Sequence, residues 1–129
     1  MNTKEFRAEL KKIMPGYKWA VKRPLDKECT WLEWLEATGI QSAGFNRMST
    51  LEIIRRTATQ RDGSATINYD AKLFGSGMRG PARASAKNIT LARTLRGLQE
   101  CCEAMRAEYT ACARALEIGR DKKEGTETT

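Results

Sequence analysis

Residues 65–73 of this chain read Ala-Thr-Ile-Asn-Tyr-Asp-Ala-Lys-Leu. Apolar and polar side chains alternate along the stretch, with the period of two that turns successive side chains to opposite faces of a β-strand. The stretch therefore predicts a strand with one buried face. The apolar face would hold Ala65, Ile67, Tyr69, Ala71 and Leu73, and the polar face Thr66, Asn68, Asp70 and Lys72.

Two further strands are predicted before this one. The β-branched run at 48–57 is separated from it by Arg61-Asp62-Gly63, which contains the Asp-Gly signature of a hairpin turn. Upstream, apolar residues at 17, 19 and 21 alternate with Lys18 and Lys22 until a proline ends the run at 24. In residues 26–46, Thr30 with Glu33 could open a short helix, but a strand would also fit, and we treat the segment as an insertion. These elements predict a three-stranded antiparallel sheet.

Helices are predicted on both sides of the sheet in the sequence. Asn2 can cap a first helix that Pro15-Gly16 ends. After a loop at 75–86, a long amphipathic helix is expected over 88–119. The fold class is thus α+β in the order helix, three strands, helix, with a single domain over 1–119. The polar tail at 120–129 is expected to be disordered.

The long helix carries an apolar seam with spacings of four and three residues, which is the heptad pattern of a coiled coil. At about 1.5 Å per residue the helix would be roughly 45 Å long, whereas strands of ordinary length span about 20–30 Å. Either the helix breaks near Gly97, or its overhang pairs with a second copy or another protein. We favour a homodimer, with an interface formed by Leu98, Cys102, Met105, Tyr109, Cys112 and Leu116.

The composition narrows the classes of function. The chain has 129 residues, 23 Lys and Arg, 16 Asp and Glu, and no histidine, which gives a formal charge of +7. Without histidine it cannot form Ser-His or Cys-His nucleophile pairs or the usual histidine-containing zinc sites. We therefore expect a non-enzymatic protein with no metal and no cofactor. The positive charge favours an acidic partner, such as nucleic acid, a ribonucleoprotein or an anionic protein face.

The cellular location follows from two absences in the sequence. No stretch approaches the roughly 18 apolar residues that span a bilayer, and residues 1–10 are charged where a signal peptide would be apolar. Three of the four cysteines lie in one helical segment, which favours reduced thiols over a disulfide framework. A cytoplasmic protein without membrane contact is expected.

Three groups of cations are candidate contact surfaces. The first lies in the glycine-rich loop and at the expected helix start, the second on the predicted strand at 17–21, and the third on the predicted strand at 48–57. Residues 75–80 match G-x-G-x-x-G, but we interpret them as a flexible basic loop because no parallel βαβ unit surrounds them. The three groups are Arg79, Arg83 and Lys87; Lys18, Lys22 and Arg23; and Arg55, Arg56 and Arg61. Trp31 and Trp34 are interpreted as core residues rather than as exposed anchors.

Two resemblances bear on function. The order helix, three strands, helix resembles the double-stranded-RNA-binding domain, which implies that Arg83 and Lys87 would contact phosphates. The short basic chain with an Asn-Thr-Lys-Glu-Phe-Arg start looks like the small accessory proteins of bacteriophages, including anti-CRISPR proteins. This second resemblance implies a counter-defence inhibitor that blocks a host nucleoprotein by stoichiometric binding. Alternatively, the chain would bind nucleic acid directly or sequester a nucleotide signal.

Overall fold

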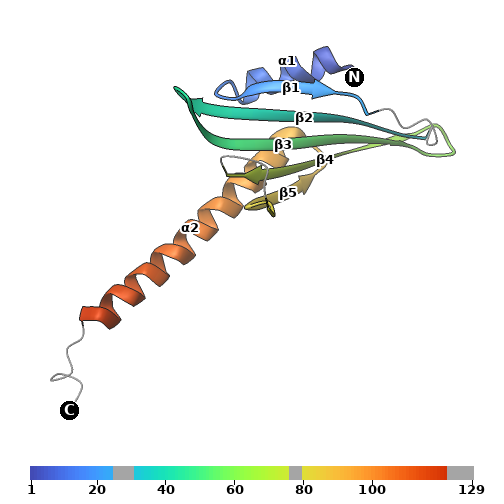
Figure 1. Ribbon diagram of the computed structural model, residues 1–129. Helices are drawn as coiled ribbons and strands as arrows, with labels where there is room; N and C mark the ends of the chain where they lie inside the picture. The colour runs from blue at the N-terminus through green and yellow to red at the C-terminus, as the bar shows by residue number, and fades with distance from the viewer. Residues whose placement is uncertain (25–30, 76–79, 122–129) are drawn as a thin grey trace.

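A computed structural model describes residues 1–24, 31–75 and 80–121 of the chain. Two helices flank a five-stranded antiparallel sheet whose strands lie side by side in chain order (Figure 1). The α+β class is therefore confirmed. The elements are α1 (Thr3–Ile13), β1 (Lys18–Lys22), β2 (Leu32–Ala43), β3 (Asn46–Thr59), β4 (Ala65–Phe74), β5 (Ala84–Asn88) and α2 (Leu91–Asp121).

The expected number of three strands is wrong, because two strands lie where the sequence pattern is weak. Strand β2 falls within residues 26–46, which fit either a helix or a strand. Its buried positions include the small residues Ala37 and Gly39, which give little apolar signal. Strand β5 pairs along the edge of β4 and consists of small and polar residues. Lys87 therefore lies in a strand, and not at the start of a helix.

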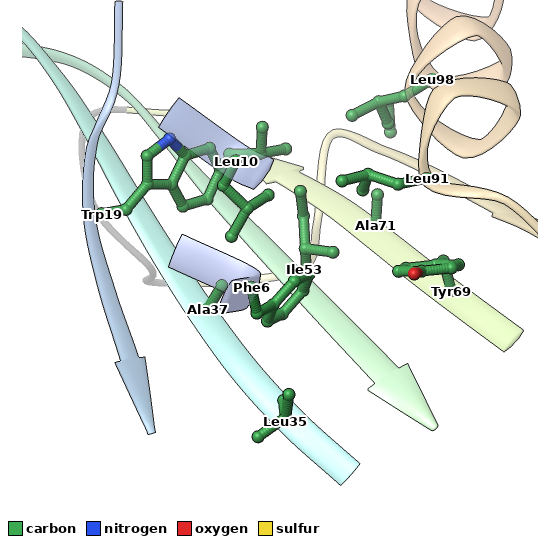
Figure 2. Packing of buried hydrophobic residues seen from close by; sticks show 12 residues of the cluster. Phe6, Leu10, Trp19, Leu35, Ala37, Ile53, Tyr69, Ala71, Leu91 and Leu98 are labelled. Carbon is green, nitrogen blue, oxygen red and sulfur yellow. The ribbon is translucent and has the colours of Figure 1, made fainter. Parts of the chain in front are cut away.

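Both helices cover the same face of the sheet. Helix α1 packs on β1 and β2, and α2 packs on β4 and β5. Figure 2 shows Phe6 and Leu10 of α1 in one cluster with Ile53 of β3, and Leu91 of α2 next to Ala71 of β4. The predicted faces of the strand at 65–73 are confirmed in part. Tyr69 and Ala71 point into this core, whereas Ala65 is exposed and Asp70 of the polar face is buried.

The N-terminal half of the core is held by a close contact between β1 and β2. Trp19 pairs with Gly39 in the strand register, and its indole covers the glycine so closely that a Cβ there would lie 2.7 Å from a ring carbon. The indole Nε1 donates a hydrogen bond to the Met14 carbonyl oxygen at 3.1 Å. The absence of a side chain at position 39 thus lets the ring lie flat on the sheet.

Helix α1 begins and ends as expected from the sequence. The Asn2 side chain accepts a hydrogen bond from the Glu5 backbone N–H at 2.8 Å, which satisfies one of the free amides of the first turn. The last turn is followed by Pro15, which cannot continue a helix. The capping prediction is confirmed.

Helix α2 is continuous and leaves the body of the protein (Figure 1). Of the two alternatives, a break near Gly97 is ruled out, because this glycine lies within the helix. It lies close to β5, since a Cβ on it would be 3.4 Å from that of Ala86. From residue 106 to 121 every side chain is exposed. The helix runs two residues beyond its expected end at 119, and the rest of the predicted tail, 122–129, lies outside the described residues.

Candidate binding surface

The face of the sheet opposite the two helices is uncovered by any described helix, and we call it the open sheet face. The strand register places on it every second residue of each strand. Its charged members come from all five strands, so side chains that are far apart in the sequence form one surface. They are Lys18, Lys22, Glu36, Glu52, Arg56, Asp70, Lys72 and Lys87.

One cross-strand row joins four of these eight charged residues. The register runs from Lys22 through Glu36, Ile54 and Asp70 to Lys87, with one residue from each strand. The Lys22 Nζ lies 3.5 Å from Glu36, and the Lys87 Nζ lies 3.8 Å from Asp70. Since both ammonium groups are largely exposed, these pairs are screened by water and leave the lysines able to contact a partner.

Asp70 is the buried centre of this surface. Its side chain is only 8% exposed, and its Oδ2 pairs with Arg56 at 3.6 Å as well as with Lys87. Its Oδ1 is buried and has no hydrogen-bond partner among the described residues. A carboxylate in this position holds Arg56 of β3 and Lys87 of the edge strand β5 close together on the open sheet face. Leaving the buried carboxylate unpaired would cost free energy.

Four of the predicted contact residues come together on the open sheet face: Lys18, Lys22, Arg56 and Lys87. The predicted grouping of Arg55 with Arg56 is wrong, because neighbours on a strand point to opposite faces. Arg55 lies on the helix-covered side, where its Nε donates to the Tyr69 hydroxyl at 3.0 Å.

The predicted loop cluster is only partly described. The Arg83 backbone N–H donates to the Leu73 carbonyl oxygen, and its side chain lies near Gly75, at the end of β4. Arg79 lies outside the described residues. The structure therefore places Lys87 with the cations of the sheet rather than with a helix start.

The two tryptophans of the segment 26–46 are not part of the core. Trp31 is 60% exposed, and Trp34 is half-buried on the open sheet face, where the register sets it opposite Arg56. The sequence-based interpretation of both as core residues is wrong. Lys72 and Glu52 also belong to the face and were not singled out, although the alternation in residues 65–73 already placed Lys72 on the polar side.

The predicted oligomer interface divides into two parts. Leu98 is buried against the sheet, and Cys102 and Met105 are half-buried at the edge of the core. Burial, together with the neighbouring Cys101 and Glu103, raises the pKa of the Cys102 thiol, so this group favours its neutral form. Tyr109, Cys112 and Leu116 are exposed on the projecting part of α2.

The net charge is concentrated outside α2. This helix contains five arginines and five carboxylates and is therefore neutral, so the formal charge of +7 lies on the rest of the chain. The arginines are Arg93, Arg96, Arg106, Arg114 and Arg120, and the carboxylates are Glu100, Glu103, Glu108, Glu117 and Asp121.

Within 1–24, 31–75 and 80–121, no three metal-ligating side chains gather closely enough to hold one ion. No helix in the same ranges is both long and apolar enough to cross a bilayer. Comparison of the chain with protein-family models, with curated proteins and with solved structures found no match.

Proposed function

We propose that the chain is a non-enzymatic cytoplasmic binding protein that uses the open sheet face to block an acidic protein surface of a host defence nucleoprotein, as a phage-type counter-defence inhibitor would. The observation that supports this proposal is the convergence of Lys18, Lys22, Arg56 and Lys87 on one uncovered sheet face. A broad face of this kind suits a flat protein surface, and a non-catalytic inhibitor needs only such a face.

The carboxylates on the same face favour a protein partner over nucleic acid. Glu36, Glu52 and Asp70 are interspersed with the cations, and a phosphate backbone that crossed the sheet would meet them. A protein surface can place its own cations opposite these acids, which also sets the register of the complex. The resemblance to the double-stranded-RNA-binding domain loses its basis, because that resemblance rested on three strands.

Charge reversal on the open sheet face tests the proposal. Lys18 and Lys72 form no ion pair within the part of the chain that the structure describes, so changing them leaves Asp70 paired. We expect Lys18→Glu with Lys72→Glu to reduce capture of the partner from host lysate by roughly tenfold, because complementary charges become repulsive. Capture should survive nuclease treatment.

A matched variant controls for net charge. Lys4→Glu with Lys12→Glu makes the same change on exposed residues of α1, away from the sheet face, and should leave capture unchanged. Equal capture by the sheet variant and the wild type would contradict the assigned surface. Loss of capture on nuclease treatment, with steep salt dependence of duplex binding, would instead identify a nucleic-acid-binding protein.

A groove at the end of β1 supports a second candidate, sequestration of a nucleotide. The groove has a volume of about 710 Å³, and Lys11, Lys18 and Tyr17 are among its lining residues. Lysine and aromatic residues are the types that bind a phosphate and a base. In this case the purified protein would absorb excessively at 260 nm, and Lys11→Glu would remove that excess. A clean protein spectrum from host-expressed material would count against it.

A further inference from the structure

The projecting part of α2, residues 106–121, packs against no other described part of the chain. It extends roughly 24 Å at about 1.5 Å per residue. It exposes large apolar side chains, with Tyr109 70% and Leu116 76% exposed. A helical segment of this length is marginal in water unless an apolar face is packed. The segment therefore needs a covering surface.

The exposed seam continues the one that packs on the sheet. Leu91, Leu95 and Leu98 face the core, Cys102 and Met105 lie at its edge, and Tyr109, Cys112 and Leu116 follow at the same spacing. A helix that paired side by side in the parallel sense would bring its first half to the space occupied by this chain's own sheet. This overlap excludes a parallel pair of straight helices, so the two helices would pair in the antiparallel sense.

We infer that a second copy of this chain covers residues 105–116 of α2 as an antiparallel two-helix pair. In an antiparallel heptad seam the two core positions of each heptad alternate across the interface. The register that uses all the exposed seam residues places Met105 opposite Leu116 of the second copy, and Tyr109 opposite Cys112 of the second copy. The Met105 layers then pack two aliphatic side chains against each other, and the Tyr109 layers set a large ring against the small Cys112.

The flanking charges match this register. Arg106 comes to lie near Glu117 of the second copy, and Arg120 near Glu103 of the second copy, with both pairs repeated by the two-fold axis. The opposite flank carries Glu108 beside alanines, so no like charges meet there. Because α2 is neutral, the two helices add no net repulsion of their own where they meet. The inference does not rest on the function proposed for the open sheet face.

Two exposed residues of the projecting helix provide a matched test of self-association. Leu116 lies on the seam, whereas Ile118 is 60% exposed and lies off it. By sedimentation equilibrium of the full chain, the wild type should be a dimer. Leu116→Asp should weaken dimerisation at least about 100-fold, because two carboxylates per dimer would lose water. Ile118→Asp should dimerise like the wild type. A monomeric wild type, or equal behaviour of both variants, would overturn the inference.

Disulfide cross-linking tests the direction of the helices. The four native cysteines are replaced by alanine, and circular dichroism and sedimentation confirm that this background is folded and dimeric. A mixture of Met105→Cys and Leu116→Cys chains should form a cross-linked dimer on mild oxidation, because these positions face each other. Each variant alone should stay uncross-linked, since its two cysteines lie about 16 Å apart along the axis. Cross-linking of Met105→Cys alone would indicate a parallel pair. If the alanine background is monomeric, the comparison of Leu116→Asp with Ile118→Asp in the native chain decides whether this surface forms the dimer.

Discussion

Phe6→Ala is expected to lower the free energy of unfolding by about 3–5 kcal/mol, the usual range for removing a buried phenylalanine ring. Phe6 is 0% exposed and joins α1 to the sheet, with its ring centroid 6.4 Å from that of Tyr69 (Figure 2). The helix carries only one other fully buried side chain, Leu10, so the cavity would remove a large part of what holds α1 in place. The measurement is the midpoint of urea unfolding followed by circular dichroism.

A second variant in the same helix shows whether the loss reflects burial. Ile13 is 38% exposed at the end of α1, so Ile13→Ala should lower the free energy of unfolding by only about 1 kcal/mol, because more of this side chain stays in water than of Phe6. If Phe6→Ala and Ile13→Ala lowered the free energy of unfolding equally, α1 would not pack on the sheet as described.

Gly39→Ala is expected to destabilise the protein by about 1–3 kcal/mol, although it adds a single methyl group. The new Cβ would lie 2.7–2.8 Å from three carbons of the Trp19 ring, closer than carbon atoms can approach. The ring cannot move freely, because its Nε1 is hydrogen-bonded to the Met14 carbonyl oxygen. Thermal unfolding should show a lower Tm, with the fluorescence of the displaced indole changed in the folded state.

Two comparisons isolate this contact. Gly16→Ala has no atom within 4 Å of its added Cβ and should leave the Tm nearly unchanged. In a double-mutant cycle, Trp19→Phe should relieve the overlap, so the double variant loses less stability than the two single losses added together. Strict additivity of the two substitutions would show that the ring does not lie over position 39.

Periodicity identified the elements that bury a continuous apolar face. The stretch at 65–73 and the seam of α2 both place large side chains at regular spacing, which makes their type and direction readable from residues alone. Strands β2 and β5 were not predicted, because positions such as Gly39 and Ala84 are small residues that are buried only through contact with a neighbouring element. Small residues carry no strong apolar signal, so only the pairing of strands reveals them.

The cations of the candidate surface were recognised individually, but their grouping was not. Lys22 and Lys87 lie at opposite edges of the sheet and share one row with Asp70 only because three strands lie between those edges. Arg55 and Arg56 are adjacent in the chain yet lie on opposite faces. Distance along the sequence is thus a poor guide to which charges act together on a sheet.

The sequence by itself determined the α+β class, the capped first helix, the hairpin turn at Asp62-Gly63 and the length of the last helix, because each depends on local geometry or on a regular apolar repeat. Only the tertiary structure decided the number of strands, the face on which each cation lies and the projection of α2 beyond the sheet. These features depend on register and packing between distant segments, and the free energy that selects them comes from contacts that no single stretch contains.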